Sequence, residues 1–132
     1  MDGITPNGDA AVDVLVVEDE PAVALLMTSV LEDLHYRVAV ARDGIDALEQ
    51  VEVVRPRLIV TDLAMPRMGG VELMQRLNER GCRTPVIVVS ARMDMAREVA
   101  PLRPAGMLRK PFDVDEFEKV ITDQLEPTNP TS

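Results

Sequence analysis

Five short apolar runs alternate along the chain with segments whose apolar residues have helical spacing. The runs are rich in β-branched residues, which favour strands, and they span residues 12–17, 36–41, 58–61, 85–90 and 106–109. Strands separated by helices need right-handed crossovers, which give a parallel sheet covered by helices on both faces. The alternation therefore predicts an α/β, doubly wound (βα)5 architecture with a five-stranded parallel sheet in the flavodoxin-like order 2-1-3-4-5.

The segments between the runs predict amphipathic helices. In the first of them the apolar face consists of Val23, Leu26, Met27, Val30, Leu31 and Leu34. Pro21 suits the first turn of this helix, and Gly81 suits the end of the third helix. The fourth segment offers only about two turns before Pro101 and Pro104 interrupt it. We therefore expect a short fourth helix.

The length of 132 residues suffices for one domain with a core of its own, and we expect that domain to span residues 11–125. Residues 1–10 and 126–132 are rich in Gly, Pro, Asn, Thr and Ser and show no hydrophobic period. Such composition predicts a flexible tail at each end.

Composition excludes several classes of function. The net charge of −9 repels phosphate backbones, and the three aromatic residues (Tyr36, Phe112 and Phe117) are too few for base stacking, so we expect no direct binding of nucleic acid. No apolar stretch approaches the roughly 20 residues of a membrane span, and no secretory signal opens the chain. The single cysteine, Cys82, fits a reducing compartment. We expect a cytoplasmic protein.

Polar residues stand at the carboxyl ends of four predicted strands. Glu18 and Asp19 follow the first strand, Asp62 the third, Ser90 the fourth and Lys110 the fifth. A polar residue at one strand end is ordinary. Parallel strands, however, bring their carboxyl ends to one edge of the sheet, and the order 2-1-3-4-5 opens a crevice above the first and third strands. The five residues together therefore indicate a site.

Three carboxylates in one crevice raise each other's pKa values unless a cation joins them. Mg²⁺, or the similar Mn²⁺, fits best, because such hard ions prefer oxygen ligands, keep several waters and work with phosphates. Zinc lacks its usual ligands, since His35 and Cys82 are each alone of their kind.

A carboxylate beside such a metal can attack phosphorus and form an aspartyl phosphate. Asp62 is the best candidate for this nucleophile, because it lies centrally between the other polar groups. The phosphoryl group also needs positive charge and hydrogen-bond donors around its oxygens. Lys110 supplies the charge and Ser90 the hydroxyl.

The same residues lie in motifs that resemble the receiver domain of two-component response regulators, of the single-domain type. The resemblance covers about residues 12–125 and rests on LVVEDEP, LIVTDLAMPRMGG, PVIVVSAR and LRKPF, in that order. It implies that Asp62 accepts the phosphoryl group. It also implies that Glu18, Asp19, Asp62 and the backbone carbonyl of Ala64 hold Mg²⁺.

Further roles follow from the resemblance. It implies that Ser90 moves toward the phosphoryl group as a switch, that Lys110 pairs with that group, and that the peptide bond between Lys110 and Pro111 is cis. The residues two positions past Asp62 and Ser90, which are Ala64 and Arg92, tune the rate of hydrolysis in this family. For Arg92 the sequence leaves two positions open, over the phosphoryl group or on the surface.

The chain departs from the family at several positions. Met107 replaces an aromatic residue that moves together with the switch hydroxyl, so the expected switch pair here is Ser90 and Met107. A thioether fills similar space but has no ring. The turn RPAGM at residues 103–107 replaces the usual turn, and Gly69 stands where Asp is common, which predicts a looser loop after Asp62.

The resemblance implies a receiver domain phosphorylated by a sensor histidine kinase or a histidine phosphotransfer protein. Such a domain catalyses its own phosphorylation and dephosphorylation, is a monomer or weak dimer, and signals to a downstream protein target. The expected target surface is the fourth helix, fifth strand and fifth helix, while the kinase would dock near the first helix.

Three alternatives remain open. The chain could be a docking module that works without phosphorylation, or a receiver fragment of a hybrid kinase or larger regulator. A phosphohydrolase of the haloacid dehalogenase type also uses an Asp nucleophile, but it places a second Asp two residues later, where this chain has Ala64.

Overall fold

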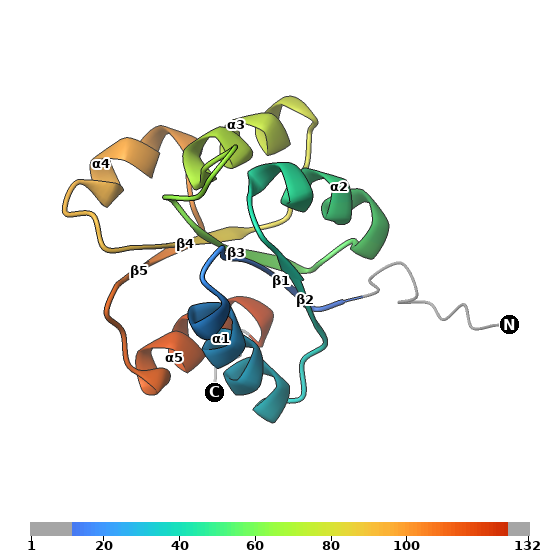
Figure 1. The fold of residues 1–132 in the computed structure, drawn as a ribbon, viewed down its shortest axis with the longest axis vertical. Helices are drawn as coiled ribbons and strands as arrows, with labels where there is room; N and C mark the ends of the chain where they lie inside the picture. Colours follow the sequence, from blue (N-terminus) through green and yellow to red (C-terminus); the bar gives the residue numbers. More distant parts are fainter. Residues whose placement is uncertain (1–11, 127–132) are drawn as a thin grey trace, which may run out of the picture.

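The computed structural model describes residues 12–126 as five strands, five α-helices and one short 3-10 helix (Figure 1). The strands are β1 (Val14–Val17), β2 (Val38–Ala41), β3 (Leu58–Asp62), β4 (Val86–Ser90) and β5 (Gly106–Arg109). The helices are α1 (Pro21–Asp33), α2 (Gly44–Val54), α3 (Gly70–Glu79), α4 (Met95–Val99), η1 (Ala100–Leu102) and α5 (Val114–Leu125).

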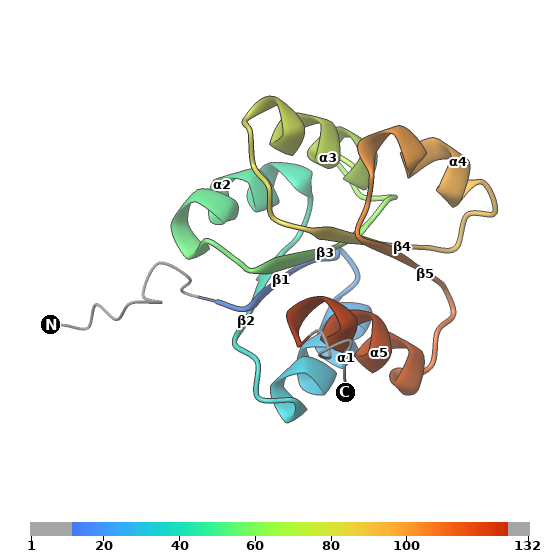
Figure 2. The same cartoon turned by 180° about the vertical axis from the view of Figure 1, so that it is seen from behind.

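All strand pairs are parallel and the sheet order is β2-β1-β3-β4-β5, which confirms the predicted fold. Helices α1 and α5 cover one face of the sheet, and α2, α3 and α4 cover the other (Figures 1 and 2). Because both faces are covered, β1, β3 and β4 are buried at every position. The two faces give two apolar core clusters, one on each side of the sheet.

Helix α1 buries a narrower face than its sequence pattern predicts. Its buried residues include Met27, Val30 and Leu31, as expected. Leu26 belongs to the predicted apolar face, but its side chain is 45% exposed. Leu26 lies at the border of the buried face and, with Val23 and Phe112, lines an apolar depression of about 330 Å³ next to the carboxyl end of β5.

Helix α5 has a capping motif at its first turn and a buried apolar face along its length. Asp113 accepts a hydrogen bond from the backbone N–H of Glu116, and the Glu116 carboxylate accepts one from the N–H of Asp113, which closes a capping box. Beyond this cap, Phe117, Ile121 and Leu125 repeat every four residues and are all buried. The helix therefore begins at a defined residue and presents one apolar stripe to the sheet.

The fourth helix is short, as predicted. It spans only Met95–Val99 and passes directly into η1, which contains Pro101. The chain then turns at Arg103, whose φ of 55° lies in the left-handed region, and Pro104 follows. The two prolines prevent a regular helix from continuing across this face of the sheet.

The strand bounds differ from the predicted ones near the amino ends of the sheet. Strands β1 and β2 begin two residues later than expected, at Val14 and Val38. The reason is Asp13, whose carboxylate accepts hydrogen bonds from the backbone N–H of Arg37 (2.8 Å) and the guanidinium of Arg57 (3.2 Å). These contacts lie at the opposite edge of the sheet from Asp62 and serve the fold.

The predicted flexible tails, residues 1–10 and 126–132, lie outside the described residues except for Glu126. Its carboxylate accepts a hydrogen bond from the hydroxyl of Tyr36. Burial, together with this contact, raises the pKa of Tyr36 to about 12. Within residues 12–126 no helix combines the length and the apolar character of a membrane span.

Candidate functional site at the carboxyl ends of the strands

The register of the sheet brings the five predicted polar residues to one edge. Val17 pairs with Thr61, so Glu18 and Asp62 are the next residues of neighbouring strands. Ser90 pairs with Arg109, so Lys110 follows directly beyond Ser90, and its N–H donates to the Ser90 carbonyl at 3.0 Å. Asp62 is the last residue of β3, which ends one residue later than the predicted run, and Ser90 is the last residue of β4, as in the predicted run.

Lys110 joins two carboxylates that are far apart in sequence. Its Nζ lies 3.1 Å from Oδ2 of Asp62 and 3.2 Å from Oε1 of Glu18. Burial alone would lower the pKa of Lys110, but its hydrogen bond to Asp62 and the charges of both carboxylates outweigh burial and raise that pKa. Lys110 is therefore a fixed cation at the edge of the sheet.

Asp62 is held by the start of its own loop. Its Oδ1 accepts a hydrogen bond from the N–H of Leu63 at 2.7 Å and a longer one from the N–H of Ala64 at 3.4 Å. The other oxygen, Oδ2, points to Lys110. Asp62 is buried, and both of its carboxylate oxygens accept hydrogen bonds. The same N–H and ammonium donors could also bind the oxygens of a larger anion attached to Asp62.

The carboxylates of Glu18, Asp19 and Asp62 are close enough to share one ion. One oxygen of each lies within 4.8 Å of the others, and Asp19 is exposed to solvent. Burial raises the pKa of Glu18, because Lys110 and the N–H of Glu20 offset only part of its desolvation. Three acids opposed by one lysine leave negative charge in excess, which fits an oxygen-preferring divalent cation such as Mg²⁺.

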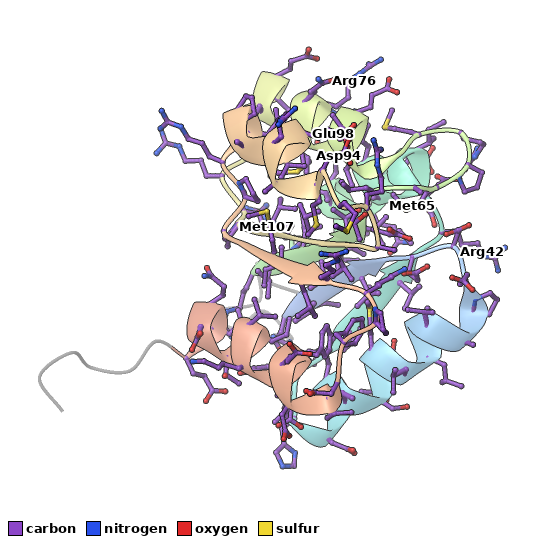
Figure 3. The ribbon with its side chains drawn as sticks, turned by 90° about the vertical axis from the view of Figure 1, so that its left-hand side faces the viewer. Arg42, Met65, Arg76, Asp94, Glu98 and Met107 are labelled. Atoms are coloured by element: carbon purple, nitrogen blue, oxygen red, sulfur yellow. The ribbon has the colours of Figure 1, made fainter. Side chains whose placement is uncertain are left out.

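Ser90 and Arg92 are linked through the backbone. Ser90 is buried, and its Oγ accepts a hydrogen bond from the N–H of Arg92 at 3.1 Å. The side chain of Arg92 pairs with Asp94 (3.4 Å) and Glu98 (3.1 Å), both of which Figure 3 shows at α4. The side chain of Arg92 is thus exposed and is held beside α4.

The remaining predicted residues lie around this edge. Ala64 is exposed in the loop after β3, and the peptide bond between Lys110 and Pro111 is cis. Met107 lies on β5 at the edge of the sheet and is 44% exposed (Figure 3). Its thioether is available at the surface between α4 and α5.

The loop after Asp62 is tight, and the prediction that Gly69 loosens it is wrong. The N–H of Gly70 donates to the carbonyl of Leu63 at 2.9 Å, so the loop folds back on its own start. A Cβ atom on Gly69 would lie 2.5 Å from the Leu63 carbonyl oxygen, and one on Gly70 would lie 2.3 Å from that of Asp62. A side chain at either position would therefore require the backbone of this loop to shift.

The sequence reasoning missed a clamp that holds the same loop to α2. Asp43 caps α2 and receives two hydrogen bonds from Arg67, at 2.7 and 3.1 Å. The hydrogen bond from Arg67 lowers the pKa of Asp43. The capping signal of Asp43 before Gly44 was readable from the sequence, whereas its pairing with Arg67 was not.

The buried carboxylate of Glu18 predicts a pH effect on metal-free protein. A raised folded-state pKa adds stability below the ordinary value of 4.5, and this stability is lost as the pH rises through the folded-state pKa. Urea unfolding in EDTA across this range should therefore show a smaller loss of stability for Glu18→Gln than for the original protein. Equal pH dependence of the two proteins would show that Glu18 ionises as it does in the unfolded chain.

Comparisons with known proteins agree with this geometry. A sequence model described as the response regulator receiver domain matches residues 14–122. The chain belongs to this family of two-component signalling domains.

Relatives and solved structures support the family assignment. The chain is 36% identical over 118 residues to the Regulator of RpoS of Escherichia coli (strain K12), covering 87% of this chain and 35% of that protein. It is 35% identical over 119 residues to the Response regulator MprA of Mycobacterium leprae (strain TN), covering 89% and 52%. The chain thus spans about a third to a half of these curated relatives.

Two solved structures share the fold over nearly their full length. The chemotaxis response regulator CheY4 of Vibrio cholerae superimposes with a TM-score of 0.78 at 26% identity, covering 83% of this chain and 95% of that one. The receiver domain of the Francisella response regulator 1452 gives a TM-score of 0.75 at 28% identity, covering 84% and 97%.

Proposed function

We propose that this receiver domain, spanning residues 11–125, accepts a phosphoryl group on Asp62 in a Mg²⁺-dependent reaction. The observation that carries the proposal is the contact of one lysine, Lys110, with both Asp62 and Glu18 at the edge where β1, β3, β4 and β5 end. A cation fixed beside a buried aspartate can balance charge on a phosphoryl group attached to that aspartate.

Glu18, Asp19, Asp62 and the backbone carbonyl of Ala64 would hold the Mg²⁺. The ion would supply charge neutralisation at the phosphoryl oxygens. Among the residues themselves, Asp19 is the exposed member of the acidic group, and Glu18 is the buried one whose second oxygen binds the N–H of Glu20. This difference in exposure suits direct binding of the Mg²⁺ by Asp19 and a more indirect role of Glu18 in holding the ion.

The transfer forms one bond and breaks one. A carboxylate oxygen of Asp62 attacks phosphorus, and the bond from phosphorus to the donor atom breaks, with its electron pair remaining on the donor. For a phosphohistidine that donor is an imidazole nitrogen, which then takes a proton from solvent. Lys110 stays within reach of the arriving phosphoryl oxygens, and the Ser90 hydroxyl can leave the N–H of Arg92 to donate to them.

Incubation with acetyl phosphate tests the proposal. In Mg²⁺ the protein should take up one phosphoryl group per chain, whereas in EDTA uptake should fall to the background of the buffer. Intact-mass spectrometry measures both. Uptake that is equal with and without divalent ion would contradict the proposed role of the acidic group.

We further propose that the phosphodonor is a histidine of a sensor kinase or phosphotransfer protein that docks beside α1. The apolar depression lined by Val23, Leu26 and Phe112 lies next to Lys110 and is suited to an apolar helix face. Signalling would then proceed through a protein target on α4, β5 and α5, where Met107 is exposed. Target binding that is unchanged in Asp62→Asn would instead favour a docking module independent of phosphorylation.

A further inference from the structure

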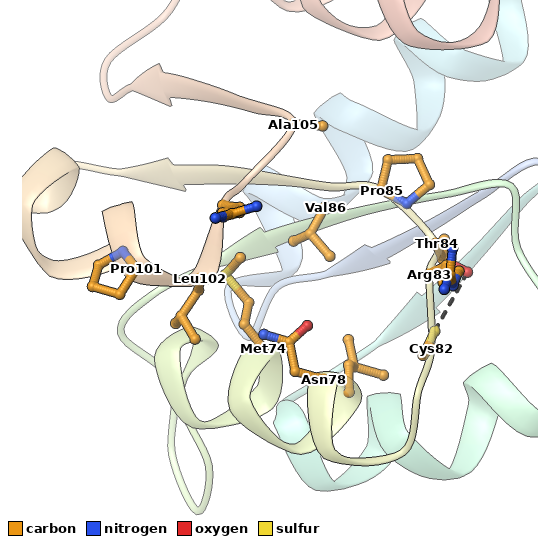
Figure 4. A pocket seen from close by; sticks show the side chains of 12 residues that line it. Met74, Asn78, Cys82, Arg83, Thr84, Pro85, Val86, Pro101, Leu102 and Ala105 are labelled. Carbon is orange, nitrogen blue, oxygen red and sulfur yellow. Dashed lines mark hydrogen bonds between the residues drawn. The ribbon is translucent and has the colours of Figure 1, made fainter.

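The end of the molecule opposite Asp62 contains a cavity that the proposed phosphorylation does not use. It has a volume of about 610 Å³ and lies between α3, η1 and the segments leading into β4 and β5 (Figure 4). Val86, the first residue of β4, and Ala105, just before β5, both line it, which places it at the amino ends of these strands. Asp62, in contrast, ends β3.

The cavity lies where the short fourth helix ends. Helix α4 stops at Val99, η1 ends at Leu102, and the chain turns at Arg103, which itself lines the cavity. Met74 and Leu77 of α3 and Leu102 of η1 line the cavity, and Figure 4 shows Met74 and Leu102 next to each other. This gives the cavity an apolar wall of flexible side chains.

The charged residues that line the cavity are all positive. They are Arg83 and Arg103, and no acidic residue is among the lining side chains. Within residues 12–126 neither arginine has a carboxylate partner, although the whole chain has a net charge of −9. Both arginines are exposed, so they are free to meet an anionic partner.

Taken together, an apolar wall and two unpaired arginines select for a ligand with both an apolar and an acidic part. The mouth is open, since Asn78, Arg83 and Arg103 are exposed at its border. A protein segment that inserts one side chain fits such an opening better than a small molecule, which is usually enclosed over most of its surface.

We propose that this cavity docks an acidic segment of a partner protein. One apolar side chain of the segment contacts Met74, Leu77 and Leu102, and flanking carboxylates pair with Arg83 and Arg103. This docking surface is independent of the phosphorylation of Asp62, because the two sites lie at opposite ends of the sheet.

A peptide selection tests the proposal. A random peptide library displayed on phage is selected on the full chain, with counter-selection on the double variant Arg83→Glu/Arg103→Glu. We expect enrichment of peptides that combine an apolar residue with nearby Asp or Glu. Their affinity should fall about tenfold or more in Arg103→Glu, and stay within about twofold in Arg97→Glu, an exposed arginine of α4 outside the cavity lining.

The single cysteine provides a second readout at the cavity itself. Cys82 is a free thiol that lines the cavity, so a bound peptide should slow its alkylation by iodoacetamide. The same protection is expected in Asp62→Asn, which separates this proposal from the proposed phosphorylation. The proposal would be overturned if acidic peptides were not enriched, or if Arg103→Glu left peptide binding unchanged. It would also be overturned if octanoate alone, a small acid with an apolar chain, protected Cys82, because the cavity would then be a small-molecule site.

Discussion

Replacing Lys110 by Met is expected to slow phosphoryl uptake from acetyl phosphate by about a hundredfold or more. Lys110 contacts Asp62 at 3.1 Å, and its raised pKa keeps it charged at every pH of interest. Methionine has a similar length but no charge, so the transferring phosphoryl oxygens lose their side-chain cation. The initial rate of uptake in Mg²⁺, followed by intact-mass spectrometry, measures the effect.

Two further variants separate charge from geometry. Lys119→Met makes the same chemical change at an exposed ion pair of α5 and should leave the rate within about twofold. Lys110→Arg keeps the charge but changes its shape, and should give an intermediate rate. A rate for Lys110→Met within about threefold of the original protein, with the fold intact by circular dichroism, would exclude the proposed role of Lys110.

The largest expected effect on stability is that of Phe117→Ala. Phe117 is fully buried in the core cluster between the sheet and α1 and α5, and its ring stacks on Phe112 with a centroid distance of 5.5 Å. Removing the ring leaves a cavity that a well-packed core fills only in part. We expect a loss of about 3–5 kcal/mol in the free energy of unfolding, measured by urea titration.

The matched control for this change is Val114→Ala, in the same helix. Val114 is 41% exposed, so its truncation should cost less than about 1 kcal/mol. Phe117→Leu, which keeps much of the apolar volume, should fall between the two variants. If Phe117→Ala were as stable as Val114→Ala, the packing described for α5 would be incorrect.

The fold could be predicted because its sequence signals are local and repeat along the chain. Apolar runs such as residues 58–61 and 85–90 are too short for helices and end in polar residues, and parallel pairing follows from the helices between them. The exposure of Leu26 could not be read in this way. It depends on which side of α1 faces the sheet, and the depression that Leu26 lines also contains Phe112, which is distant in sequence.

In the site, too, local sequence patterns predicted some features, and contacts between distant residues could not be predicted. The polar residues at the strand ends could be placed at one edge, since that edge is fixed by the direction of the strands. The bridge from Lys110 to Glu18 spans 92 residues, and the clamp between Asp43 and Arg67 spans 24. Such pairings depend on side-chain geometry within the folded domain, which no local pattern contains.

The central claim is that Asp62 carries the phosphoryl group. The most direct test is to treat the protein with acetyl phosphate and Mg²⁺, reduce it with sodium borohydride, and sequence its peptides by mass spectrometry. Reduction converts an aspartyl phosphate to homoserine, because the acyl phosphate is an activated carboxyl group. Homoserine at position 62 alone is the expected result. Homoserine at position 19, or none at position 62 despite uptake of phosphoryl groups, would contradict the claim.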